Sequence, residues 1–237
     1  MVKKILEKAK GKFEGETIFI LGNGPSLNNH DLELLKDKYT MAFNRFYLAD
    51  VSWKPTFYTA ADEGILIDYG KEISEYIPQV KYPLFPSVHP TGLRIRPYIQ
   101  GDNITWYQLH WGRMFLKESK MRFGLNGTVT NVGLQIAAWL GFKTIYLLGV
   151  DMKWHIPESV INVNGRDLIS TEDDLNHFTP DYFGPGHRWH IPKVDIMLEK
   201  LAEFESRFKS MGGRLVNLNP DSAFVDCEFS DYESSVI

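Results

Sequence analysis

The sequence contains a single cysteine, Cys227, and therefore cannot form a disulfide within the chain. A chain without disulfides is typical of a reducing compartment, so we expect a cytoplasmic protein. The sequence has no run of eighteen apolar residues, and we expect no transmembrane segment. Its basic start, Met1 to Lys4, is followed by charged residues, so we expect no signal peptide.

Positive charge is not in excess either. The chain has 26 Lys and Arg against 30 Asp and Glu, a net charge of −4 that argues against non-specific nucleic-acid binding. With 43% hydrophobic and 24% charged residues, the composition is ordinary for a globular protein. The length of 237 residues suffices for one sizeable α/β domain. We predict a single domain over residues 1–237, with irregular insertions at 86–125 and 152–190.

A glycine-rich turn follows the first apolar run, in the sequence IFILGNGPSL of residues 18–27. The apolar residues predict a buried strand, and the residues after the turn open a helical pattern. Glycine lets the backbone approach a ligand closely, and a helix N-terminus offers unpaired N–H groups. The turn therefore predicts a phosphate-bearing ligand, although it matches neither the G-x-G-x-x-G pattern nor a P-loop. The predicted binding residues here are Gly22, Asn23, Gly24, Pro25 and Ser26.

Strands and helices alternate along the rest of the chain. Strands are predicted over 39–43, 56–60, 82–85, 104–108, 144–149 and 214–218. Helices are predicted over 2–12, 63–76, 128–140 and 193–211. The alternation predicts a Rossmann-like α/β fold: a mostly parallel sheet with helices on both faces, and a long lid-like insertion near 152–190.

Polar residues follow five of the predicted strands, and ligands of such sheets bind at the carboxyl ends of the strands. These residues are Asn23, Asn44, Asp62, Asp151 and Asn219. Asn and Asp are also favoured in turns and helix caps, so each one alone is as consistent with a structural role. As a set they predict a shared edge, where Asn offers both a donor and an acceptor without adding charge.

Aromatic residues cluster in polar surroundings between Trp154 and Trp189. Core packing is the commoner role of such residues, and the alternative is a platform for a base or a sugar ring.

Four blocks of the sequence resemble bacterial sialyltransferases of glycosyltransferase family 42 and their relatives in the MptE-like superfamily. The superfamily takes its name from an archaeal 6-hydroxymethylpterin pyrophosphokinase. The blocks are GNGPSL (22–27), FNRFY (43–47), GFKTIYLLGVD (141–151) and YFGPGH (182–187), and the resemblance covers about residues 17 to 220. It implies an inverting transferase of polysaccharide biosynthesis. Such an enzyme moves a sialic-acid-like sugar from a CMP-activated donor to a glycan acceptor, without a metal or other cofactor.

The resemblance also implies roles for particular residues. It places Asn23 and Asn44 at donor contacts, the turn Gly127-Thr128 around the nucleotide, and His187 as the general base. His187 also suits that role chemically, because a neutral imidazole in a polar Gly-Pro-Gly-His-Arg loop can accept a proton from a hydroxyl. The bland alternative is a surface histidine.

The departing phosphate needs cations or hydrogen-bond donors around it if no metal is present. The candidates are Arg188, Tyr182, Arg45 and Lys153, each of which has a solvated surface role as its alternative. Two tyrosines of the sialyltransferase pattern are replaced here by Lys153-Trp154-His155, so the resemblance does not define the leaving-group chemistry.

Two other functions remain open on the sequence. Asp62 and Asp151, if they follow neighbouring strands, could hold Mg²⁺ for an ATP-dependent pterin pyrophosphokinase. A nucleotide-binding protein without activity is the third candidate. His190, three residues after His187, gives only a weak metal signal. Peripheral membrane association and homo-oligomers also stay open.

Overall fold

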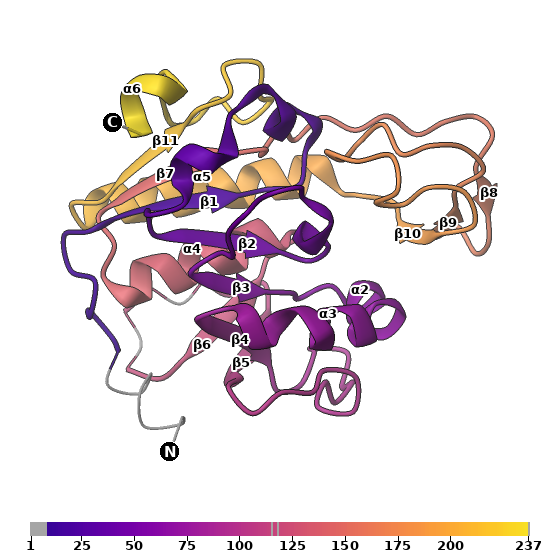
Figure 1. Cartoon of the computed structure of the whole chain (residues 1–237), viewed down its shortest axis with the longest axis horizontal. Coiled ribbons are helices and arrows are strands. Elements are labelled where there is room, and N and C mark those ends of the chain that lie inside the picture. The colour runs from indigo at the N-terminus through magenta and orange to yellow at the C-terminus, as the bar shows by residue number, and fades with distance from the viewer. Residues whose placement is uncertain (1–8, 115, 118, 237) are drawn as a thin grey trace.

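A sheet of nine strands lies at the centre of the structure (Figure 1). Its order is β12-β11-β7-β1-β2-β3-β4-β5-β6, and every neighbouring pair is parallel. The strands are β1 (Thr17–Leu21), β2 (Thr40–Phe43), β3 (Phe57–Thr59), β4 (Tyr82–Pro86), β5 (Thr105–Trp111), β6 (Arg122–Leu125), β7 (Thr144–Leu148), β11 (Arg214–Asn217) and β12 (Glu228–Phe229). The computed structural model describes residues 9–114, 116–117 and 119–236.

Helices cover both faces of this sheet. They are α2 (Glu63–Asp68), α3 (Gly70–Tyr76), α4 (Val129–Leu140), α5 (Val194–Ser210) and α6 (Tyr232–Val236). In β1, Ile18 and Ile20 pack into the core that contains α4 and α5, whereas Phe19 and Leu21 pack into the core that contains α2 and α3. A strand buried on both faces is what a parallel sheet requires, and the predicted Rossmann-like α/β fold is confirmed.

The side of the sheet on which successive strands are added changes at β1. From β1 to β6 the strands are added on one side, and β7 then pairs with the other side of β1. Ligands of open α/β sheets bind in the crevice at such a switch point, at the carboxyl ends of the strands. The glycine turn after β1 lies at this position.

Several elements differ from the sequence predictions. The segment 86–125 was predicted as irregular, with a strand over 104–108. It contains β5, which is longer than that prediction, and the edge strand β6, which was not predicted. The helix predicted over 63–76 is two helices, because Tyr69 leaves helical geometry at φ −123° and ψ 17°. Of the helix predicted over 2–12, residues 2–8 lie outside the described residues and 10–12 form a turn.

The insertion at 152–190 forms an arm that projects from the sheet in Figure 1. It carries a small antiparallel sheet in the order β10-β9-β8, formed by β8 (Ile161–Asn162), β9 (Asp167–Ile169) and β10 (Arg188–His190). The sequence predicted the insertion but not these strands, which are at most three residues long and have no clear alternation.

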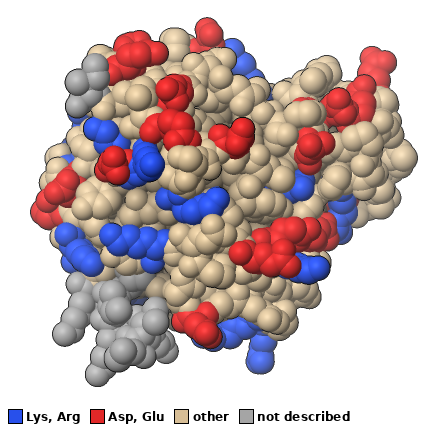
Figure 2. All heavy atoms as spheres, in the orientation of Figure 1, with Lys and Arg blue, Asp and Glu red and all other residues tan. Residues whose placement is uncertain are grey.

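Both signs of charge appear on the face of the molecule seen in Figure 2, including on the arm. None of the helices in the described part of the chain combines the length and hydrophobicity needed to cross a bilayer.

Candidate functional site

The ends of β1 and β7 approach each other so closely that two glycines are required between them. The N–H of Gly22 donates to the carbonyl oxygen of Leu148 at 2.7 Å, and that of Gly24 to Gly149 at 2.8 Å. A Cβ atom on Gly22 would lie 2.2 Å from the Gly149 carbonyl oxygen, and one on Gly24 would lie 2.4 Å from Asp151 Oδ2. Only glycine leaves room for this contact.

Asp151 holds the turn in place from the end of β7. Its carboxylate accepts hydrogen bonds from the Ser26 backbone N–H at 3.0 Å, from the Ser26 hydroxyl, and from Asn219 Nδ2 at 2.7 Å. Asp151 is buried. All three donors belong to the protein, so this carboxylate ties the exits of β1, β7 and β11 together.

These contacts change what the glycine turn can offer to a ligand. The N–H groups of Gly22, Gly24 and Ser26 are already bonded within the protein, and Pro25 has none. The predicted helix start is a 3-10 turn of five residues, Pro25–Asn29. Most N–H groups of the turn are therefore engaged within the protein, and what the turn offers to a ligand is centred on Asn23.

Three asparagines at strand exits carry buried oxygens without a partner. Asn23 follows β1, Asn44 follows β2 and Asn126 follows β6. Among the described residues, buried side-chain polar atoms without a hydrogen bond are the Oδ1 atoms of these three and Nε1 of Trp154. A buried acceptor left unpaired costs about 1–3 kcal/mol, and such groups in a native protein call for an explanation.

The amide nitrogens of the same side chains are engaged, which leaves the oxygens as the open ends. Asn23 Nδ2 donates to the Phe43 carbonyl at 3.4 Å, and Asn126 Nδ2 donates to Asn131 Oδ1 at 3.5 Å. The Asn44 side chain is hydrogen-bonded to Tyr182. Sequence reasoning missed Asn126, although the residue directly precedes the predicted Gly127-Thr128 turn, because it also missed β6.

Two residues with strained backbone conformations lie at the same edge of the sheet. Of the described residues other than glycine, Asn44 and Met152 have positive φ angles, of 51° and 52°. Asparagine tolerates this conformation, but methionine adopts it rarely. Strained residues persist where the surrounding structure enforces them, often at functional sites. Met152 turns the chain so that Lys153 faces the hollow described below.

The Gly127-Thr128 turn begins α4 at the same end of the sheet. Thr128 Oγ1 caps the helix by accepting from the Thr130 N–H at 3.3 Å. One turn further, Gly133 lies against the ring of Phe43, the last residue of β2, so the helix starts near the exit of β2. The positive end of this twelve-residue helix therefore points toward the strand ends.

His187 is held in one tautomer by the backbone. Its Nδ1 lies 3.0 Å from the carbonyl oxygen of Gly184, which can only accept, so Nδ1 carries the hydrogen and Nε2 of the neutral ring keeps a free lone pair. The ring stacks on Tyr69 with centroids 6.0 Å apart. This arrangement is suited to a general base.

The other two predicted catalytic residues have partners within the protein. Arg188 pairs with Asp68 of α2 at 3.1 Å, and both side chains are about a third or more exposed. Tyr182 is buried and stacks on His177, with centroids 3.8 Å apart. Burial raises the pKa of Tyr182 well above its usual value, so the phenol stays protonated.

Arg45 fastens the arm to the sheet. This buried guanidinium donates to the carbonyl oxygens of Asp181, at 3.0 Å, and of Tyr182. It lies 4.0 Å from the centre of the Tyr69 ring, whose pKa burial raises to about 12. With these contacts made, Arg45 has a positioning role, and its charge is directed at the arm.

The magnesium hypothesis assumed that Asp62 and Asp151 follow neighbouring strands, but the strands that they follow are not neighbours. Asp62 follows β3, and two strands separate β3 from β7, a distance of roughly 14 Å at three strand spacings. Asp62 caps α2 by accepting from the Ile65 N–H at 3.0 Å. His190 pairs with Asp167 at 2.5 Å. No group of three or more His, Cys, Asp or Glu side chains in the described chain is arranged to hold a metal ion.

An open hollow lies beside the glycine turn and the first residues of the arm. It is lined by Pro25, Ser26, Asn29, Asp151, Lys153, Trp154, His155, Leu175, Asn176, Asn219 and Asp221. Lys153 makes no ion pair or hydrogen bond with the described residues, in contrast to Arg45 and Arg188. Of these three predicted cations, Lys153 is therefore the one whose charge is available to a ligand.

Comparison with known proteins gives a family and a fold. The sequence profile of the family described as 6-hydroxymethylpterin diphosphokinase MptE-like matches residues 1–156. No curated protein matches the chain.

The sialyltransferase CstII of Campylobacter jejuni, solved with the substrate analogue CMP-3FNeuAc, is similar in structure. The TM-score is 0.53 and the identity 15%, over 90% of this chain and 86% of that chain. The monofunctional alpha-2,3-sialyltransferase Cst-I of the same organism is similar with a TM-score of 0.49 and 16% identity, over 90% and 79%. The resemblance stated from the sequence is confirmed, and at these identities the structural likeness is one of fold.

Proposed function

Given that the chain belongs to the 6-hydroxymethylpterin diphosphokinase MptE-like family, we propose that it is a transferase acting on a nucleotide-activated substrate. The specific proposal is a glycosyltransferase that moves a sialic-acid-like sugar from CMP to a hydroxyl of a glycan. The observation that carries it is the pair of buried, unpaired asparagine oxygens, of Asn23 and Asn44, at the exits of the neighbouring strands β1 and β2. The fold shared with the sialyltransferase CstII is consistent with it.

The unpaired oxygens favour contact with the nucleoside part of the donor. They are acceptors, so they need O–H or N–H groups from the ligand. Ribose hydroxyls and the exocyclic amine of cytosine supply such groups, whereas an ionised phosphate supplies only acceptors. We therefore assign Asn23 and Asn44, which follow the neighbouring strands β1 and β2, to the nucleoside and look elsewhere for the phosphate contacts.

The phosphate has two sources of positive potential in this proposal. One is the start of α4 at Gly127 and Thr128, where a helix N-terminus favours an anion. The other is Lys153, which has no partner among the described residues and lines the hollow with Ser26. As the sugar leaves, charge grows on the phosphate, and a fixed cation there stabilises the transition state.

The proposed step has His187 as the base. Nε2 takes the proton of the acceptor hydroxyl while its oxygen bonds to the anomeric carbon of the sugar. The bond between that carbon and the phosphate oxygen breaks, and its electron pair leaves with CMP. Attack from the face opposite the leaving group inverts the configuration.

A thermal-shift panel with CMP, CDP, UDP, GDP and ATP, each with and without Mg²⁺, tests the nucleotide. We expect CMP to raise the Tm, equally with Mg²⁺ and with EDTA, because a ligand that binds the native state stabilises it. No shift with CMP at millimolar concentration would contradict the proposal. A shift with ATP that EDTA abolishes would instead support the second candidate, a pterin diphosphokinase, which the family description favours.

Asn44→Gly tests the unpaired oxygens. Glycine accepts the positive φ of this position, and removal of the unpaired buried oxygen offsets loss of the side-chain contact with Tyr182, so we expect the Tm to change little. The Kd for CMP, measured by calorimetry, should rise roughly tenfold because a buried hydrogen bond is lost. Cytidine is the control ligand, and its Kd should rise by the same factor. A loss seen with CMP but not with cytidine would place this side chain at the phosphate and contradict the assignment.

A further inference from the structure

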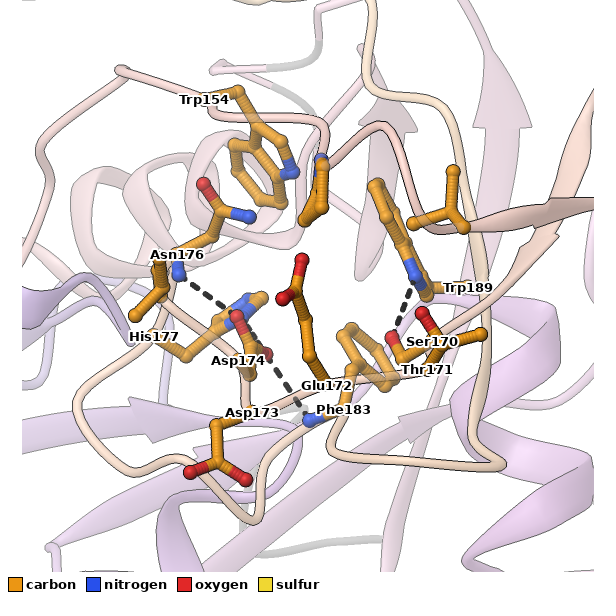
Figure 3. Close-up of a pocket in the computed structure, with 13 residues that line it drawn as sticks. Trp154, Ser170, Thr171, Glu172, Asp173, Asp174, Asn176, His177, Phe183 and Trp189 are labelled. Carbon is orange, nitrogen blue, oxygen red and sulfur yellow. Dashed lines mark hydrogen bonds and ion pairs between the residues drawn. The ribbon is translucent and has the colours of Figure 1, made fainter.

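The arm contains a second pocket that the proposed mechanism does not use (Figure 3). It lies within the insertion, and its lining includes Trp154, Glu172, Asp173, Asp174, His177 and Trp189. Its interior is narrow and holds a single group of the size of a water molecule or an ammonium. The pocket is therefore suited to an end group of a larger ligand.

One donor and one acceptor on the aromatic rings of this lining have no partner in the described protein. Nε1 of Trp154 is buried and unpaired. His177 uses Nδ1 to contact Asp174 Oδ2 at 2.6 Å, which leaves Nε2 as a free acceptor. Asp174 also accepts from the N–H groups of Asn176, at 2.7 Å, and Phe183, at 3.0 Å, so the His177 ring has a fixed orientation. One donor and one acceptor are thus free to form hydrogen bonds with a ligand.

The charge of the lining is negative. It includes three acidic residues and neither lysine nor arginine. In Figure 3 the Glu172 carboxylate points into the space between the rings of Trp154 and Trp189, whereas Asp173 points away. Glu172 Oε1 accepts from the Ser159 hydroxyl at 2.9 Å, and Oε2 has no partner among the described residues. A carboxylate between two indole rings favours a cation, because both the charge and the ring faces attract it.

We propose that this pocket binds an ammonium group whose neighbouring carbon carries an oxygen, the arrangement found in an amino sugar. The ammonium lies between Glu172 and the two indoles, and the adjacent oxygen accepts from Trp154 Nε1. Because Trp154, Leu175 and Asn176 line both this pocket and the hollow beside the glycine turn, a ligand can extend from one to the other. Identifying the ligand as part of the glycan acceptor rests on the proposed function, but the binding itself does not.

The test is a titration of the full chain with glucosamine, followed by NMR of the tryptophan indole N–H signals. We expect the Trp154 signal to shift on addition of glucosamine, and glucose to bind roughly tenfold more weakly because it lacks the cation. Glu172→Gln should weaken glucosamine binding by a similar factor. Trp154→Phe keeps an aromatic ring but removes the donor, and calorimetry should show a several-fold weaker Kd.

Glu158→Gln is the matched control, since Glu158 is an exposed carboxylate of the same insertion outside the pocket lining. It should bind glucosamine as the parent protein does. Equal affinity for glucose and glucosamine would overturn the ammonium assignment, and no response of Trp154 would overturn the site. CMP is titrated into the same samples, so that a protein that binds CMP but not glucosamine keeps the proposed function and loses only this inference.

Discussion

Replacing His187 with alanine is expected to lower kcat for sugar transfer by about 10²–10⁴-fold, the usual contribution of a general base. The Kd for CMP should stay within about twofold, because the buried oxygens proposed to hold the nucleoside belong to other residues. The reason lies in the geometry: the Gly184 carbonyl fixes the proton on Nδ1, and the lone pair of Nε2 is the only part of the ring left for chemistry. Steady-state kinetics and calorimetry on the same preparation measure both quantities.

Chemical rescue separates a base from a structural residue at this position. Added imidazole can diffuse into the space left by the side chain and should restore part of the activity of the alanine variant. The loop around His187 has backbone hydrogen bonds of its own, from Ser170 N–H to the His187 carbonyl and from Gly186 N–H to Ser170, so it should keep its conformation. An unchanged kcat, or a loss of CMP binding equal to the loss of rate, would contradict the proposed role.

The sequence predicted the central elements because their signals are local. The apolar run before Gly22 and the smooth helical pattern closed by Gly141 correspond to β1 and α4. The edge of the sheet was harder to predict. Strand β6 spans only Arg122–Leu125 and pairs only with β5, so its four residues give no pattern long enough to predict a strand.

The sequence predicted which residues belong to the candidate site better than it predicted what those residues do there. Asn23 and Asn44 lie at strand exits as expected, but an unpaired oxygen can be recognised only when every neighbour is known. Asp151 has the properties of a ligand contact in the sequence. In the fold its carboxylate is used by Ser26 and Asn219, residues 125 and 68 positions away, and no local pattern reveals such contacts.

Gly22→Ala is expected to destabilise the protein severely. Its Cβ would lie 2.2 Å from the carbonyl oxygen and 2.7 Å from the carbonyl carbon of Gly149, and neither backbone atom can rotate away. Relief requires β1 and β7 to separate, at a cost of about 3 kcal/mol or more in the free energy of unfolding. For a chain of this size we expect the Tm to fall by roughly 6–12 °C in a calorimetric scan.

Gly101→Ala is the matched control for this variant. The new Cβ would meet only side-chain atoms of Ile77 and Ile104 at 3.2–3.4 Å, and these can give way, so the Tm should move by no more than about 2–4 °C. Separation of β1 from β7 also displaces Asn23 and the Ser26 contact to Asp151, so any folded Gly22→Ala protein should bind CMP weakly. A Gly22→Ala protein as stable as the control would show that the two strand exits do not lie in contact, and the assignment of Asn23 to the nucleoside would fail with it.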